Sequence, residues 1–257
     1  MGGGDSLPSM FAKLYVVQGS HPCATAERAL ALKGLSYQRV ELVELAHMPL
    51  QRLRFGAPTV PGMVFEDGEK VLGSRAIVRR LDERVANPPL FPSDPDERAR
   101  VEELERWGDE KLQSLARRIC WATFRHNGRP MPSYAEGSKW PVPAVAVRAV
   151  GPIIAHGAAR VHGADDSQLL EDVRAVPDVV AHVNRAIDEG TIGGGAPNAA
   201  DLQIAPSIRL MLTFDDLKPM IERTPAGELA LRLFPDWAGH APAGTIPTPM
   251  VPSSAPA

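Results

Sequence analysis

The sequence predicts an α/β plus all-α protein, in which a small sheet domain is followed by a helical bundle. In residues 11–86, apolar and β-branched stretches alternate with helical ones in the order βαβ, then ββα. In residues 96–234, the apolar residues recur at helical spacing and no convincing strand is found. Residues 87–95 (NPPLFPSDP) hold four prolines in nine positions, which prevents a continuous helix and favours an extended linker.

Four strands and a helix are expected first. Residues 13–17 (KLYVV) predict a strand, and residues 24–33 predict a helix that ends at Gly34. Residues 37–43 alternate like a half-buried strand. The stretches 62–66 and 70–72 flank Asp67-Gly68, a dipeptide that suits a tight turn, and together predict a β-hairpin.

A helix should follow the hairpin and close the first domain. Ser74 stands at its expected N-cap, and Ile77, Leu81 and Val85 share one helical face. The Ser74 hydroxyl and the free N–H groups of the first helical turn would form a site that suits a carboxylate. Helix capping alone explains a serine there equally well.

The second domain is expected to be entirely helical. Helical patterns cover residues 95–124, 145–161 and 168–188. Asn198, with Asp201 three residues later, resembles a reciprocal capping arrangement at the start of another helix. Residues 1–10 and the Pro-rich residues 235–257 are expected to be loose tails, because they have too few apolar groups to offset the entropy of ordering.

Composition excludes several functions. With 28 Lys and Arg against 31 Asp and Glu, the net charge is −3, so nucleic acid is not expected as a partner. Two cysteines cannot form a disulfide framework or fill a cysteine-rich metal site, and the first residues hold no apolar signal. A membrane span needs about 20 apolar residues, and the longest apolar runs of this sequence are short. We therefore expect a cytoplasmic protein with no metal and no membrane segment.

Cys23 is the first candidate for chemistry. It lies where the first strand meets the first helix, and a helix N-terminus favours the reactive thiolate. The alternative is that Cys23 is a small buried apolar residue. Pro61, just before a strand, is either an edge residue or part of a cis bond.

Three segments carry a resemblance to a known family. They are HPCATAERALALKGLSYQRVEL, TVPGMVFEDGEKVLGSRAI with the LDE that follows it, and NAADLQI. In this order and spacing, from residue 13 to residue 234, the chain resembles a cysteine-type, omega-like or bacterial member of the glutathione S-transferase superfamily. The resemblance implies a thioredoxin-like first domain, an all-helical second domain, and a homodimer that uses glutathione as co-substrate.

The resemblance also implies roles for individual residues. Cys23 matches the reactive position, Val60 would pair its backbone with the cysteinyl part of glutathione, and Pro61 would be cis. Ser74 would bind the γ-glutamyl carboxylate. Gly73 stands where the family commonly has Glu, and Arg75 could partly compensate for that loss. Ala26 stands where a two-cysteine redox pair would have its second cysteine, so any thiol-disulfide exchange would use a single thiol.

A small hydrophobic electrophile is expected as the second substrate, in the cleft between the domains. Four aromatic residues are candidates for its walls, with core packing as the alternative: Trp107, Trp121, Phe124 and Tyr134.

The leading hypothesis is a glutathione transferase-like enzyme in which Cys23 performs thiol transfer or glutathione-dependent reduction. If Ser20 faced the ligand instead, conjugation of glutathione to an electrophile would describe the reaction better. The same fold acting with another low-molecular-weight thiol, or as a non-catalytic interaction module, is the alternative.

Overall fold

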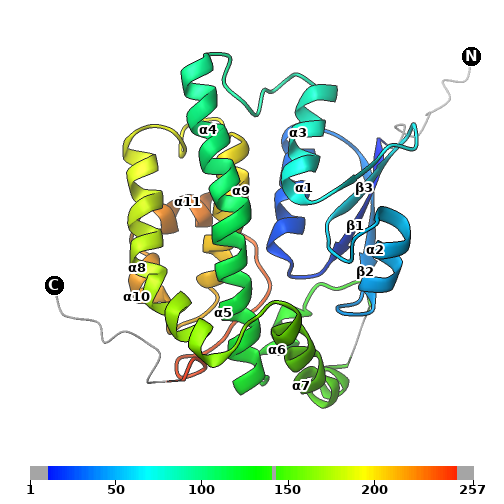
Figure 1. Ribbon diagram of the computed structural model, residues 1–257, viewed down its shortest axis with the longest axis vertical. Helices are drawn as coiled ribbons and strands as arrows, with labels where there is room; N and C mark the ends of the chain where they lie inside the picture. The colour runs from blue at the N-terminus through cyan, green and yellow to red at the C-terminus, as the bar shows by residue number, and fades with distance from the viewer. Residues whose placement is uncertain (1–10, 141–142, 248–257) are drawn as a thin grey trace, which may run out of the picture.

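A four-stranded sheet forms the N-terminal part of the molecule. The computed structural model describes residues 11–140 and 143–247. The strands have the order β2-β1-β3-β4, with β1 parallel to β2 and β3 antiparallel to both of its neighbours (Figure 1). In chain order the elements are β1 (Ala12–Val17), α1 (His21–Leu32), β2 (Tyr37–Leu42), α2 (His47–Phe55), β3 (Gly62–Phe65), β4 (Lys70–Leu72) and α3 (Ser74–Arg84).

Helices make up the rest of the described chain beside this sheet. A long helix runs through α4, a π-helical turn η1 and α5, and the others pack around it (Figure 1). The elements are α4 (Pro95–Trp107), η1 (Gly108–Leu112), α5 (Gln113–His126), α6 (Met131–Tyr134), α7 (Ala144–Val161), α8 (Asp166–Asp188), α9 (Ala199–Met211), α10 (Lys218–Ile221) and α11 (Pro225–Leu233). The predicted α/β plus all-α fold is confirmed.

Local signals placed several elements correctly. The hairpin turns at Asp67-Gly68, where Gly68 has a φ of 88°. At the start of α9, the Asn198 side chain accepts hydrogen bonds from the N–H groups of Ala200 and Asp201, and the Asp201 carboxylate accepts one from the N–H of Asn198. This reciprocal capping box satisfies N–H groups that a helix start otherwise leaves without partners.

Other expectations need correction. Helix α1 begins at His21 rather than at residue 24, because Pro22 fits the first turn, where no N–H is needed. Helix α2 was not predicted: it has only two buried residues, so its apolar periodicity is weak. Of the sequence beyond α11, residues 235–247 are packed rather than loose. Ala241 donates its N–H to the Thr213 carbonyl at 2.8 Å, and Ile246 is fully buried.

The expected tails at 1–10 and 248–257 lie outside the described residues. In the described part of the chain, the 18-residue helix α7 is long and apolar enough to meet the length and hydropathy criteria for a membrane span, and 22% of its residues are buried. It packs against α5 and α6. The absence of a membrane segment stays a prediction.

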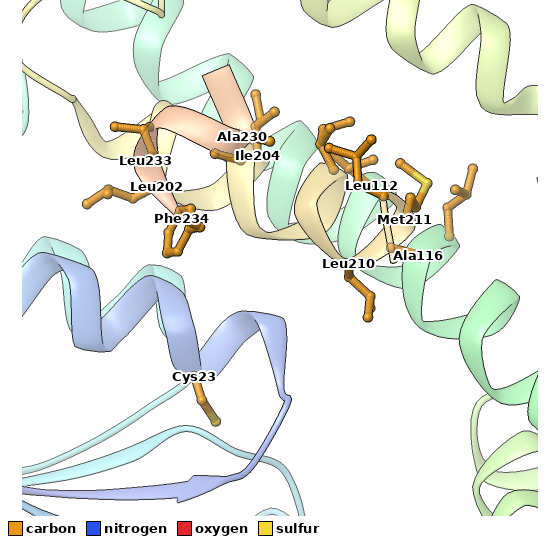
Figure 2. Packing of buried hydrophobic residues seen from close by; sticks show 14 of the residues in the cluster. Cys23, Leu112, Ala116, Leu202, Ile204, Leu210, Met211, Ala230, Leu233 and Phe234 are labelled. Atoms are coloured by element: carbon orange, nitrogen blue, oxygen red, sulfur yellow. The ribbon is translucent and has the colours of Figure 1, made fainter. Parts of the chain in front are cut away.

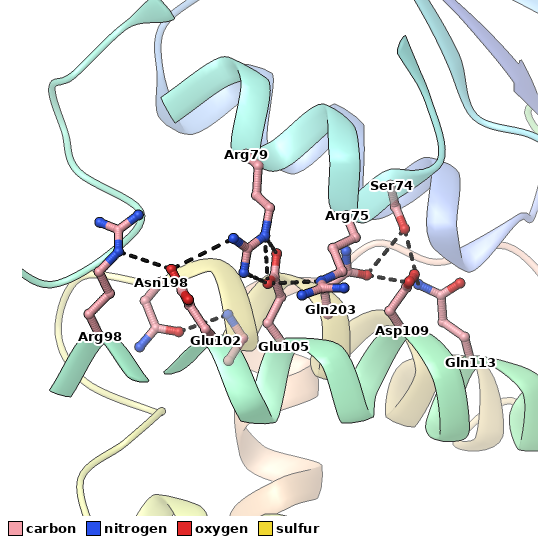
Figure 3. Close-up of polar contacts among 11 residues, drawn as sticks. Ser74, Arg75, Arg79, Arg98, Glu102, Glu105, Asp109, Gln113, Asn198 and Gln203 are labelled. Carbon is pink, nitrogen blue, oxygen red and sulfur yellow. Dashed lines mark hydrogen bonds and ion pairs between the residues drawn. The ribbon is translucent and has the colours of Figure 1, made fainter. Parts of the chain in front are cut away.

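The two parts share buried contacts. Helix α1 packs against α9, where the Thr25 hydroxyl donates to the Leu202 carbonyl at 2.8 Å. Helix α3 contacts α4 through Arg75 and Arg79, which both reach the fully buried Glu105 (Figure 3). These contacts fix the relative position of the sheet and the helices, and hence the shape of the space between them.

Candidate functional site

A cavity of about 330 Å³ lies between the sheet and the helices. From the N-terminal part it is lined by Ser20 and by Val60, just before β3. Trp121, Phe124 and Tyr134 line it from α5 and α6, and most of its other walls are apolar. The structure therefore brings together five of the residues named from the sequence as ligand-binding or catalytic candidates: Ser20, Val60, Trp121, Phe124 and Tyr134.

Ser20 lies on the cavity wall at the start of α1, and its hydroxyl is near the Cys23 thiol. Its backbone is extended, with φ −76° and ψ 113°, and its side chain caps none of the helix N–H groups. The first turn of a helix leaves N–H groups without intrahelical partners and carries a partial positive charge. A hydroxyl and a positive helix end on the cavity wall suit an anionic ligand atom such as a thiolate.

Cys23 lies one turn further along α1 and does not line the cavity. Its side chain is 1% exposed and points from α1 toward the sheet, away from the helical part (Figure 2). Burial raises its pKa to about 12, against smaller opposing effects of the Ser20 hydroxyl and the Val17 backbone. The prediction of a lowered thiol pKa is wrong, because loss of hydration outweighs the helix N-terminus.

Pro61 is cis, as the resemblance implied. Its carbonyl accepts a 2.9 Å hydrogen bond from the N–H of Gly73, which joins the start of β3 to the start of α3. Gly73 has a φ of 93°, which L side chains rarely adopt, and a Cβ there would meet nothing within 4 Å. Neither Pro61 nor Gly73 lines the cavity.

Ser74 and Arg75 face the helical part rather than the cavity (Figure 3). The Ser74 hydroxyl is 3.0 Å from Gln113 Nε2 and donates to Gln203 Oε1 at 3.2 Å. Arg75 Nε donates to the buried Glu105 carboxylate at 3.0 Å. Both side chains already have protein partners, so their role in binding a ligand stays a prediction.

The two predicted tryptophans have different surroundings. The Trp107 ring packs in a tilted arrangement against the His182 ring within the helical part, with ring centroids 4.5 Å apart, and does not line the cavity. Trp107 is partly buried against the core, which fits the core alternative, and a role in binding substrate stays a prediction. Trp121 does line the cavity, as does Tyr134, whose hydroxyl is 2.6 Å from Thr213 Oγ1 and whose pKa is raised by burial.

Sequence reasoning missed a polar corner of the same cavity. It contains His21, His47, Arg117 and His162. Burial lowers the pKa of His21 well below its usual value and that of His162 to about 4. For Arg117 a signal existed: it is four residues from Trp121 and seven from Phe124, which puts all three on one face of α5. His47 belongs to α2, which the sequence did not reveal.

The described residues hold no group of three His, Cys, Asp or Glu side chains that could bind a metal ion.

Residues 14–89 match the family model for the glutathione S-transferase N-terminal domain. A stretch of 101 residues is 34% identical to maleylacetoacetate isomerase from Pseudomonas aeruginosa strain PAO1. The N-terminal domain of this chain, residues 14–89, belongs to the glutathione S-transferase superfamily. The match to that isomerase covers 34% of this chain and 44% of the relative, so less than half of the relative is spanned.

Solved glutathione S-transferase-like structures share the fold over most of the chain. The beta-etherase LigF from Sphingobium sp. strain SYK-6 has a TM-score of 0.63 at 19% identity, covering 87% of this chain and 94% of its own. A glutathione S-transferase from Rhodospirillum rubrum F11 has a TM-score of 0.61 at 20% identity, with 95% and 93% covered. A theta-class enzyme from Xanthomonas axonopodis pv. citri, solved with glutathione bound, has a TM-score of 0.53 at 16% identity, with 76% and 80% covered.

Proposed function

We propose that this protein conjugates glutathione, through its sulfur, to an apolar electrophile, and that the Ser20 hydroxyl stabilises the glutathione thiolate. One observation carries the proposal: Ser20, with its hydroxyl free of any capping bond, lies at the start of α1 on the wall of the cavity between the two parts. A hydroxyl donor aimed at a developing or resident anion in a poorly hydrated site is an effective electrostatic catalyst.

In the proposed reaction the glutathione thiol first loses its proton to solvent. The Ser20 hydroxyl and the free N–H groups at the start of α1 stabilise the resulting thiolate. The sulfur then attacks an electrophilic carbon, a C–S bond forms, and the leaving group departs with the electron pair of the bond that breaks. No oxidant or reductant is needed.

The surroundings of Cys23 favour conjugation over thiol-disulfide exchange. Exchange needs an accessible thiolate, since the thiolate is the attacking species. Cys23 is 1% exposed and its pKa is raised to about 12, so it is protonated at neutral pH and shielded from a substrate. We therefore assign the reactive sulfur to the co-substrate rather than to the protein.

The other walls support an apolar second substrate. Trp121 and Tyr134 line the helical side of the cavity, together with apolar side chains from α5, α7 and α9. An apolar body placed against these walls would lie close to Ser20, because all of them border the same 330 Å³ space.

The test compares three variants in conjugation of glutathione to 1-chloro-2,4-dinitrobenzene. We expect Ser20→Ala to lower kcat/KM by about a hundredfold to a thousandfold, as removal of one anion-stabilising donor commonly does. Cys23→Ala should retain turnover within about threefold, since it removes one buried sulfur that does not line the cavity. Ser20→Thr, which keeps the hydroxyl, should restore part of the activity.

The pH profile separates this mechanism from a folding defect. In Ser20→Ala the apparent pKa of bound glutathione should rise, because the thiolate loses its donor. Loss of activity in Cys23→Ala with Ser20→Ala unaffected would overturn the proposal in favour of a cysteine mechanism. Equal turnover with a thiol that lacks the γ-glutamyl group, such as cysteinylglycine, would show that another low-molecular-weight thiol serves as well.

A further inference from the structure

The cavity contains an arginine that forms no ion pair within the described residues. Arg117 lines it from α5, and its guanidinium donates a long hydrogen bond, 3.5 Å, to Gln113 Oε1. Within residues 11–140 and 143–247, no carboxylate forms an ion pair with Arg117. Burial lowers its pKa, and the nearby Asp109 and Glu44 carboxylates oppose that shift without pairing with it. A guanidinium keeps its charge at neutral pH.

Three arginines outside the cavity are paired with carboxylates. Arg118, the next residue of α5, donates from Nε and Nη2 to the two Asp172 oxygens at 2.7 Å each. Arg75 and Arg79 both reach Glu105. A positive charge taken out of water without a partner is costly, and such groups concentrate at ligand sites. Arg117 lines the cavity and makes no such ion pair in the described residues, which a ligand would explain.

The other titratable groups of the cavity leave this charge in place. His21 and His162 have pKa values lowered by burial, so both rings are neutral at pH 7. The Glu41 carboxylate is paired with Arg39 and also accepts a hydrogen bond from the N–H of Lys139. The two neutral imidazoles cannot balance the Arg117 charge, and the Glu41 carboxylate is already paired with Arg39.

Glu44 and His47 complete the polar lining. Burial raises the pKa of Glu44, and its carboxyl feels the Arg117 charge without forming an ion pair with it. The buried Nδ1 of His47 has no hydrogen-bond partner in the described part of the chain. An anion in this part of the cavity could therefore bind the Arg117 guanidinium and the His47 imidazole. The Glu44 carboxyl on the cavity wall opposes it, as does the Asp109 carboxyl outside the cavity.

We propose that Arg117 binds a carboxylate of the second substrate, so that this enzyme acts on electrophiles with an apolar body and one carboxylate group. Only the reaction step rests on the proposed glutathione transfer; the binding step stands on the cavity alone. The planar guanidinium fork matches a carboxylate in a two-point hydrogen-bonded pair. Trp121, four residues along the same face of α5, would lie against the apolar body.

The experiment measures binding of 2-naphthoate and of its neutral analogue 2-naphthamide, by quenching of tryptophan fluorescence, in the absence of glutathione. Trp121 and Trp140 both line the cavity and report on occupancy. In the wild-type protein, we expect naphthoate to bind about tenfold or more tightly than naphthamide, as one charge-assisted pair contributes. Arg117→Met should abolish the difference, and Arg117→Lys should retain part of it.

Two further variants keep the test decisive if Arg117→Met is unstable. Glu44→Gln removes the opposing carboxyl and should increase the preference for naphthoate. Arg106→Met removes an exposed positive charge from α4, outside the cavity, and should leave the preference unchanged. Equal affinities for the two ligands in wild type, or a preference for naphthoate that survives in Arg117→Met, would overturn the proposal.

Turnover separates this inference from the proposed function. With glutathione, 4-chloro-3-nitrobenzoate should be preferred over 4-chloro-3-nitrobenzamide, with chloride as the leaving group in both, and Arg117→Met should remove the preference. If neither is converted while naphthoate selectivity follows Arg117, glutathione transfer fails and the carboxylate site holds. If Arg117→Met instead weakens glutathione binding and leaves naphthoate selectivity intact, Arg117 serves the co-substrate and the inference fails.

Discussion

Glu105 is predicted to be a main polar support of the junction between α3 and α4. Its side chain is fully buried, and it accepts hydrogen bonds from Arg75 and Arg79, whose side chains are 30% and 31% exposed (Figure 3). Breaking a buried ion pair costs about 3–5 kcal/mol. Because both guanidinium groups are partly exposed and can regain water, we reduce this to about 2–3 kcal/mol for Glu105→Gln.

Glu102→Gln is the matched control on the same helix. Glu102 is 35% exposed and pairs with Arg98 at 2.9 Å and with Arg79 at 3.6 Å. Exposed pairs contribute less than about 1 kcal/mol. Urea unfolding, followed by tryptophan fluorescence and far-ultraviolet circular dichroism, gives both free energies of unfolding. If Glu105→Gln lowered the free energy of unfolding no more than Glu102→Gln, the buried carboxylate would not stabilise the junction and the reasoning would fail.

Three further predictions concern stability. Asp201→Ala should lower the free energy of unfolding by about 2 kcal/mol, since the carboxylate accepts from the N–H groups of Asn198 and Gly193; equal stability in chemical denaturation would contradict this. Gly239→Ala should cost about 1–3 kcal/mol more than Gly244→Ala. Both glycines have positive φ, but a Cβ at 239 would approach the Tyr134 ring to 2.3 Å while one at 244 meets nothing within 4 Å, and thermal melting of the pair decides. Finally, the pKa of His162 is lowered to about 4 in the folded protein from an ordinary value of 6.5, so the unfolded chain takes up the proton first. The free energy of unfolding should therefore fall as pH drops from about 6.5 to about 4, and a series of urea midpoints should show a smaller fall in His162→Gln.

The local turns, caps and helix starts of this protein can be predicted from residue order alone. The Asp67-Gly68 turn, the capping box of Asn198 and Asp201, and the long helix beginning at Pro95 each depend on residues within a few positions of one another. Hydrogen bonds and steric limits of that range are written directly in residue order. The resemblance to glutathione S-transferases added the cis Pro61, which no local rule supplies.

Which residues line the site depends on how the sheet and the helices pack together. Cys23 and Ser20 are three residues apart on one helix start, yet only Ser20 lines the cavity, because Cys23 points toward the sheet (Figure 2). Ser74 and Arg75 are engaged by partners up to 129 residues away. Likewise, Arg117 meets Glu44 and His47 only where α5 crosses the N-terminal part. Burial and charge at these positions depend on which distant segments exclude water from them, and that arrangement is fixed only when the sheet and the helices pack together.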